Sequence, residues 1–332
     1  MRFDFSSFIC FLILKFNLTL FELAIKMRYY NAYKYFLVEK FGEPVLKIPL
    51  NGGFSCPNID GSKGFGGCTY CDNEAFSPVA LSTDDVLQQL ERGIARAHYR
   101  FKKFIAYFQP FSNTYAPVQR LKELYEPVLQ RSDVVGLALG TRPDCFEEET
   151  FHYMQDLASR TFLSVELGMQ TIHNHTLEHI NRQHTADECY SVLSRLYPMG
   201  IENVVHVVLG LPGESKDDMM ATADKIAELP VHGIKIHQLM VIEKTVMAYQ
   251  YRKGDVPTLE LDAYAELLSE FIMRLRPDQY VHRLMAECRE DSGLIAPLWS
   301  MNKRHSINLI HNYFAQTRLR QGSKCKSQFR ML

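Results

Sequence analysis

The sequence predicts an α/β fold: a partial (β/α)6 TIM-like barrel followed by a C-terminal extension. Short apolar segments rich in β-branched residues alternate with helical patterns, and most of these segments end at Gly or Pro. Such alternation implies parallel strands joined by right-handed crossovers. Six repeats are too few for a closed eight-stranded barrel. We therefore expect an open barrel whose active site lies at the carboxyl ends of its strands.

Each expected element follows from a local pattern. Ser82 with Asp85, and Ser215 with Asp218, form capping-box patterns, which predict helix starts ahead of the apolar faces that follow. Four further helices are expected at residues 117–130, 146–158, 185–198 and 260–275. The six expected strands lie at residues 45–50, 104–109, 134–140, 162–170, 203–211 and 233–241.

Composition excludes several classes of protein. The 332 residues are 46% apolar and 23% charged, with 37 Lys+Arg against 38 Asp+Glu. Ample apolar surface and balanced charge exclude a disordered chain, a collagen-like repeat and a polybasic nucleic-acid protein. The length suits one large domain as well as two.

The two ends of the chain differ from its middle. The apolar run near the N-terminus, residues 8–14, is too short to span a bilayer, so we expect no membrane association and a cytoplasmic protein. Residues 1–26 are expected to be a leader outside the fold. The barrel is then assigned to residues 27–280 and the extension to residues 281–332.

Three cysteines predict a metal centre. Cys56, Cys68 and Cys71 have the spacing C-x11-C-x2-C in a glycine-rich loop just after the first expected strand. Clustered thiols in a large chain indicate metal ligation before disulfides. Zinc at a structural site would need a fourth ligand, which this loop lacks. A 4Fe-4S cluster held by three cysteines accounts for the number of thiols better and leaves one iron open.

The same loop carries a resemblance to a known family. The segments FGEPVLKIPLNGGFSCPNIDG, GGCTYC, YFQPFSNTYAP, LGTRPDC, VELGMQTIHNHTLEHINRQHT and HVVLGLPGES occur in order. Together they resemble the radical S-adenosylmethionine (SAM) superfamily. Within it they are similar to stand-alone bacterial proteins related to the catalytic subunit of Elongator and, more distantly, to oxygen-independent coproporphyrinogen oxidase. The resemblance covers residues from about 27 to about 322.

This resemblance implies a cofactor pair and a reaction. The open iron of the cluster would bind SAM, and one electron would cleave SAM to methionine and a 5′-deoxyadenosyl radical that abstracts hydrogen from a substrate. A one-electron reductant such as flavodoxin or ferredoxin is implied as a partner. The substrate itself is not implied.

The resemblance also implies site residues. Cys56, Cys68 and Cys71 would be the cluster ligands, and Tyr70 would border the adenine of SAM. The other implied SAM contacts come from the ends of later strands. Among them Glu166 would accept hydrogen bonds from the ribose and Arg182 would pair with the methionine carboxylate, while glycines would let the backbone approach the adenine. The remaining residues of this set are Gln109, Asn113, Gln170, Gly210, Gly213 and Glu214.

The basic C-terminus leaves a question about partners. Residues 303–332 hold seven Lys+Arg and no acidic residue, a composition typical of a flexible, solvated end but also suited to binding RNA phosphates. Two alternatives to a radical enzyme stay open: a non-catalytic zinc- or RNA-binding module, and an iron-sulfur electron-transfer protein.

Overall fold

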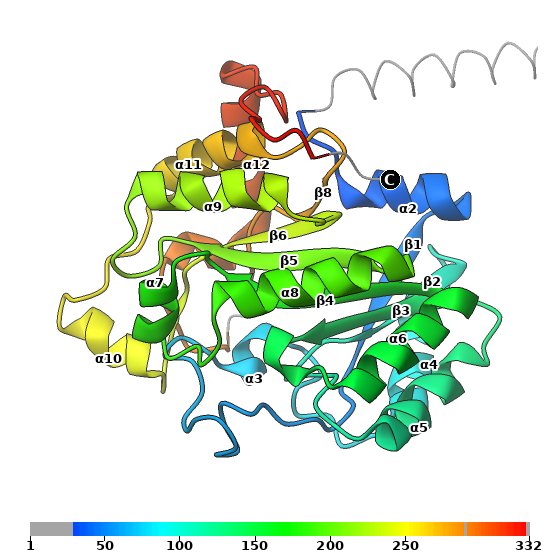
Figure 1. The fold of residues 1–332 in the computed structure, drawn as a ribbon. Helices are drawn as coiled ribbons and strands as arrows, with labels where there is room; N and C mark the ends of the chain where they lie inside the picture. The colour runs from blue at the N-terminus through cyan, green and yellow to red at the C-terminus, as the bar shows by residue number, and fades with distance from the viewer. Residues whose placement is uncertain (1–28, 289–290, 330–332) are drawn as a thin grey trace, which may run out of the picture.

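The computed structural model describes residues 29–288 and 291–329, so the expected leader at residues 1–26 lies outside the described residues. Seven parallel strands form one open half-barrel in the order β1-β2-β3-β4-β5-β6-β8 (Figure 1). This confirms the predicted partial barrel. Its strands are β1 (Val45–Leu50), β2 (Lys103–Phe108), β3 (Val134–Thr141), β4 (Phe162–Gln170), β5 (Glu202–Leu209), β6 (Gly233–Gln238) and β8 (Tyr280–Arg283).

The seventh strand was not predicted. β8 pairs with β6 in parallel and spans the boundary expected between barrel and extension. The apolar run expected to end at residue 241 is divided: β6 stops at Gln238, and β7 (Val241–Ile242) pairs antiparallel with β9 (Leu294–Ala296). The extension therefore joins the barrel sheet at its edge and adds a small second sheet beside it.

The six expected helices are present. The Ser215–Asp218 capping box is confirmed, with the Ser215 hydroxyl accepting from the Asp218 amide. The box expected at Ser82 is wrong, because Asp85 itself caps the helix by accepting from the Gln88 amide at 2.9 Å. These helices are α4 (Val86–Ala97), α5 (Val118–Leu129), α6 (Glu148–Arg160), α8 (Ala186–Leu196), α9 (Lys216–Glu228) and α11 (Leu261–Arg274).

Shorter helices were missed, and so was a long one near the C-terminus. The tail was expected to be flexible, but residues 303–316 form a helix, α12, because Ile310 and Phe314 lie one turn apart and are fully buried. Figure 1 shows α9, α11 and α12 grouped beside one part of the sheet. The unpredicted helices are α2 (Tyr33–Phe41), α3 (Asn73–Phe76), α7 (Asn174–His179), α10 (Val246–Arg252), α12 (Lys303–Gln316) and the 3-10 turns η1 (Pro143–Cys145), η2 (Tyr197–Met199) and η3 (Leu298–Met301).

The two faces of the sheet bury different side chains. On β1, Ile48 and Leu50 pack with α4 in the main apolar core, whereas Lys47 and Pro49, which alternate with them, line a cavity on the other face. This alternation follows from the two-residue repeat of a strand. At the amino ends of the strands the inner face is closed by a small apolar cluster that includes Tyr33 and Leu37 of α2. The space inside the half-barrel therefore extends from Tyr33 and Lys47 towards the carboxyl ends of the strands.

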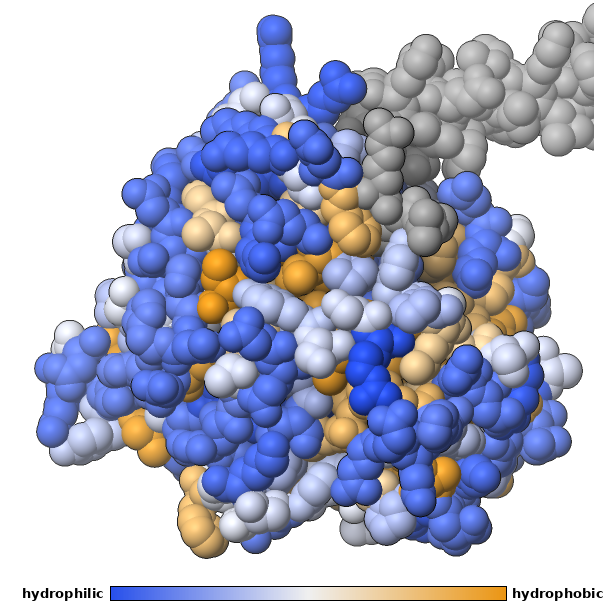
Figure 2. Space-filling model, in the orientation of Figure 1, coloured by the Kyte–Doolittle hydropathy of each residue, from blue (hydrophilic) through white to orange (hydrophobic). Residues whose placement is uncertain are grey.

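The outer surface is mostly polar. Figure 2 shows hydrophilic residues over most of the visible face, with hydrophobic residues in small areas between them. Among the described residues, no helix has the length and apolar character needed to cross a membrane.

Candidate active site

One cavity at the carboxyl ends of the strands brings the three predicted cysteines together. Cys56, Cys68 and Cys71 are all free thiols and all line this cavity. Five other predicted site residues line it as well: Tyr70, Gln109, Glu166, Gln170 and Arg182. Cys68 and Arg182, which are 114 positions apart in the chain, therefore meet where a barrel places its chemistry.

The cysteine loop is fixed by contacts with α7 and α10. Thr69, between the last two cysteines, donates its amide to the Ile180 carbonyl at 3.0 Å, and its own carbonyl accepts from the Met247 amide at 2.8 Å. Asn58 and Asn181 add a second attachment, because the Asn58 side chain donates to the Asn181 carbonyl at 2.6 Å. These bonds hold the backbone of the loop in place beside the sheet.

Arg182 lies directly against the thiols. Its Nη1 is 3.4 Å from the Cys68 sulfur, and its Nη2 donates to the Gly168 carbonyl at 2.7 Å. A Cβ on Gly168 would stand 2.5 Å from the same Nη2, so only glycine lets the guanidinium approach this strand. Desolvation of the sulfur and, after it, the neighbouring Cys68 together raise the pKa of the Cys71 thiol to about 12. A bound metal centre is what would stabilise these thiols as thiolates.

The donor set of the cavity fits an iron-sulfur cluster. Three free thiols line the cavity, and a 4Fe-4S cluster offers a different iron to each thiolate. Three buried polar atoms near the thiols have no partner among the described residues: Asn58 Oδ1, Arg142 Nη1 and Arg182 Nε. Such orphaned groups are typical of a site that receives a polar ligand.

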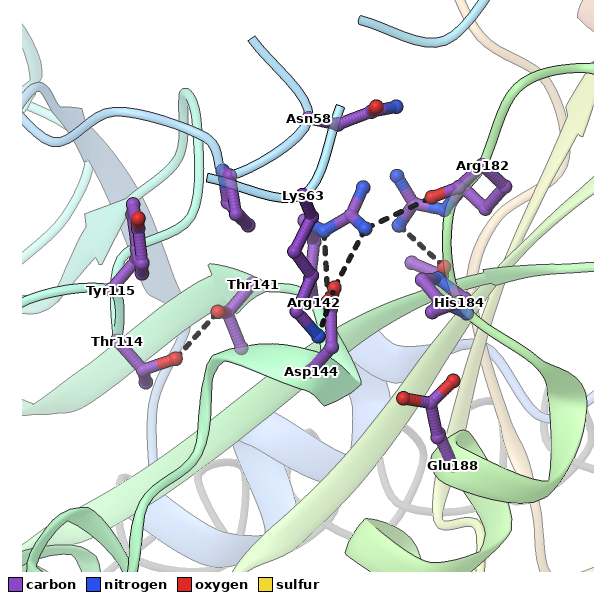
Figure 3. A network of polar contacts seen from close by, with 12 residues as sticks. Asn58, Lys63, Thr114, Tyr115, Thr141, Arg142, Asp144, Arg182, His184 and Glu188 are labelled. Carbon is purple, nitrogen blue, oxygen red and sulfur yellow. Dashed lines mark hydrogen bonds and ion pairs between the residues drawn. The ribbon is translucent and has the colours of Figure 1, made fainter. Parts of the chain in front are cut away.

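A buried ion pair supports the wall next to Arg182. Figure 3 shows Arg142 bridging Asp144 and the Arg182 carbonyl. Both carboxylate oxygens of Asp144 accept from Arg142, at 2.8 and 2.9 Å, and Lys63 of the cysteine loop lies 3.1 Å away. Burial alone would raise the pKa of Asp144, but the bonds from Arg142 lower it to about 2. The carboxylate therefore links the cysteine loop to the end of β3.

Deeper in the half-barrel, one carboxylate is shared by three basic side chains. Glu166 accepts from Lys47 at 2.8 Å, from His206 at 3.0 Å and from Lys235. Lys235 also donates to the Tyr107 hydroxyl at 2.9 Å. Burial would raise the pKa of Glu166, but its cationic neighbours hold the pKa well below the usual range.

The same arrangement changes the pKa of Lys235. Burial, with the charges of Lys47 and Arg283, lowers the pKa of Lys235 to about 7 despite the opposing effect of Glu166. One carboxylate does not neutralise every cation around it.

Four predicted site residues lie outside the lining of this cavity. Asn113 is fully buried, and its amide donates to the Phe108, Pro110 and Gly140 carbonyls, so it holds the loop after β2 together. Gly210 and Gly213 have φ values of 86° and 84° in the turn from β5 to α9. Glu214 accepts from the Thr171 hydroxyl at 2.5 Å, and burial raises its pKa. The structure does not bring these four to the thiols.

The basic side chains of the interior were missed in the sequence. Lys47, His206 and Lys235 each have an apolar residue directly before and after them in the strand. A buried parallel strand normally contains apolar residues on both faces, so a charge in its middle is the signal that one face lines a polar cavity.

Comparison with known proteins defines the class. The radical SAM superfamily model matches residues 63–226, and the Radical_SAM C-terminal domain matches residues 231–316. The chain belongs to the radical SAM superfamily and is a radical SAM enzyme. Such enzymes use a 4Fe-4S cluster and SAM, and they need a reductant and a substrate.

Individual relatives place the chain more narrowly. It is 41% identical over 285 residues to the protein YtqA of Bacillus subtilis, covering 85% of this chain and 88% of that one. It is 35% identical over 269 residues to the protein YhcC of Escherichia coli, covering 80% and 86%. Among solved structures, the Elp3 protein of Methanocaldococcus infernus matches with a TM-score of 0.61 at 16% identity, over 83% of this chain and 64% of that chain. This last likeness concerns the fold alone.

Proposed function

We propose that Cys56, Cys68 and Cys71 hold a 4Fe-4S cluster whose open iron binds SAM, and that the enzyme cleaves SAM reductively to act on a substrate inside the half-barrel. The observation that carries this proposal is that three free thiols and the Arg182 guanidinium line one cavity at the carboxyl ends of the strands. When bound, the cluster and SAM supply one electron and a hydrogen-abstracting radical.

The chain's own residues orient SAM. Arg182 retains an unpartnered Nε among the described residues, which suits it to pair with the SAM carboxylate. Tyr70 packs on a buried apolar cluster while also lining the cavity, and this position suits a border for the adenine. Gln109 and Gln170 offer side-chain amides to the remaining polar groups of SAM.

Other expected SAM contacts are assigned differently. Both oxygens of Glu166 already accept hydrogen bonds from Lys47, Lys235 and His206, so we give this carboxylate the role of organising the barrel interior instead of binding the ribose. Asn113, Gly210, Gly213 and Glu214 do not line the cavity, and we give them structural roles in the two loops that follow β2 and β5.

Partners follow from the same reaction. The enzyme needs a one-electron donor, and flavodoxin or ferredoxin is the proposed class. RNA as substrate stays a prediction. Two cations of the C-terminal tail already face carboxylates, because Lys303 pairs with Glu287 at 2.8 Å and Lys326 lies 3.9 Å from Asp224. A gel shift with total RNA at two salt concentrations tests that prediction directly.

The test is production of 5′-deoxyadenosine. Protein purified without oxygen and reconstituted with iron and sulfide is reduced with dithionite in the presence of SAM. We expect product from the wild type and loss of product in Cys56→Ala, Cys68→Ala and Cys71→Ala. The matched control is Cys189→Ala, because Cys189 is a buried thiol of the apolar core that does not line the cavity. A colourless, zinc-loaded, inactive protein would support the binding-module alternative, and a cluster without SAM cleavage would support the electron-transfer alternative.

A further inference from the structure

Three basic side chains form one row across adjacent strands. His206 of β5 is the register partner of Lys235 of β6, and Lys235 is the register partner of Arg283 of β8. All three line the cavity that holds the thiols. Residues paired across parallel strands share a face of the sheet, so the row faces the interior of the half-barrel.

The charges along this row are not balanced. Glu166 is the carboxylate that pairs with Lys47 and Lys235. Arg283 has no hydrogen bond or ion pair from its side chain within the part of the chain that the structure describes, although its charge acts on Lys235 and His206. The other acidic group lining this part of the cavity, Glu287, is half exposed and pairs with Lys303 at 2.8 Å. Lys47 and Lys235 thus share Glu166, and Arg283 has no counterion of its own among the described residues.

The His237 imidazole is a second group in this cavity with an unpartnered polar atom among the described residues. His237, two residues after Lys235 on β6, lines the cavity and is half-buried, and its buried Nε2 has no partner among the described residues. Burial lowers its pKa well below the usual value, and the charge of Arg283 adds to this effect. A neutral imidazole supplies a hydrogen-bonding nitrogen, so a ligand at Arg283 would find a polar neighbour.

There is room for a ligand beside Arg283. A second cavity, which includes Lys47 and His282, meets the first at a shared wall that contains Tyr107, Lys235 and Arg283. Lys235 and Arg283 of the basic row therefore lie on the wall between the cavity that holds the thiols and the second cavity.

We propose that Arg283, with Lys235 beside it, binds an anionic group of the substrate, a carboxylate or a phosphate, and so holds the reacting part of the substrate below the SAM site. This inference rests on the proposed function for the location of SAM. A guanidinium fits either anion in a bidentate manner, and a water-poor cavity strengthens the attraction. Arg182 and Arg142 are not part of this subsite, because they contact Cys68 and Asp144.

The test is calorimetric titration of the reconstituted enzyme, saturated with SAM, with defined small probes. Glycerol 3-phosphate and succinate are the two anionic probes, and glycerol and succinamide are their neutral counterparts. We expect at least one anion to bind and both neutral compounds to bind less tightly by roughly tenfold or more. Whichever anion binds more tightly identifies the chemical class, phosphate or carboxylate.

Variants locate the binding to the row. Arg283→Gln should weaken anion binding roughly ten- to hundredfold, and Arg283→Lys should weaken it less because the charge is kept. The matched control is Arg120→Gln, since Arg120 is exposed on α5 and pairs only with Glu123 at 3.3 Å. The absorbance of the bound cluster reports whether each variant has folded.

The outcomes separate this inference from the proposed function. Binding of the neutral probes as tightly as the anions, or unchanged anion binding in Arg283→Gln, overturns the anionic subsite. Wild-type protein that makes 5′-deoxyadenosine but binds neither anion contradicts the subsite alone. Wild-type protein that binds an anion through Arg283 but cleaves no SAM contradicts the proposed function alone.

Discussion

Replacing Glu166 by Gln is the sharpest perturbation of the barrel interior. Glu166 is 1% exposed and is the carboxylate shared by Lys47, Lys235 and His206. Gln keeps the volume but removes the negative charge, so the buried ammonium of Lys235 and the partly buried ammonium of Lys47 lose their counterion. Removing one partner of a buried ion pair typically costs about 3–5 kcal/mol. We expect a loss of that size in the free energy of unfolding, measured by urea denaturation and circular dichroism at pH 7.

A control variant and the pH dependence of stability both test this prediction for Glu166→Gln. Glu266→Gln removes a carboxylate that is 53% exposed and pairs with Lys216, so it should cost about 1 kcal/mol or less. The folded-state pKa of Glu166 lies well below 4.5, so its stabilising effect is present above that pH and is lost as the pH falls further. The difference between wild type and Glu166→Gln should therefore shrink in acid. Equal losses for the two variants at pH 7 would refute the reasoning.

Three further predictions concern the rest of the site. Gly168→Ala should lower SAM affinity about tenfold or more in equilibrium dialysis while iron content stays normal, because the added Cβ would stand 2.5 Å from Nη2 of Arg182. Unchanged SAM affinity would contradict the assigned role of Arg182. Asp144→Asn should lower the free energy of unfolding at pH 7, measured by urea denaturation, by about 3–5 kcal/mol, since the carboxylate is fully buried against Arg142. This loss should become smaller as the pH falls from about 4 towards 2. Anion binding should weaken as the pH rises through about 7, where Lys235 loses its proton, and Lys235→Arg should flatten that profile in calorimetry; an equally steep profile in the variant would exclude Lys235 as its source.

Much of the fold was predictable because its signals are local. Continuous apolar strands and capped amphipathic helices are encoded within a few residues, as in β4 and in the Ser215 box of α9. β8 was missed because its four residues, Tyr280–Arg283, show no apolar run, and its pairing with β6 depends on tertiary contact. α12 was missed because the basic composition of the tail indicated a flexible end, although Ile310 and Phe314 form a buried pair one turn apart.

The site was predictable only in part, for a similar reason. The spacing of Cys56, Cys68 and Cys71 is a sequence property, and the structure places these thiols in one cavity. The contact between Arg182 and Cys68 joins residues 114 positions apart, so spacing alone does not reveal it. The row formed by His206, Lys235 and Arg283 depends on the register of three strands, which no single segment of the sequence specifies.

The most direct test of the central claim is the electron paramagnetic resonance spectrum of the reduced, reconstituted enzyme before and after SAM is added. Three cysteine ligands leave one iron open to SAM. We therefore expect a 4Fe-4S signal that changes when SAM binds and is absent in the Cys56→Ala, Cys68→Ala, Cys71→Ala triple variant. A signal that is unaffected by SAM, or that persists in the triple variant, would contradict the assignment of these cysteines and of the open iron.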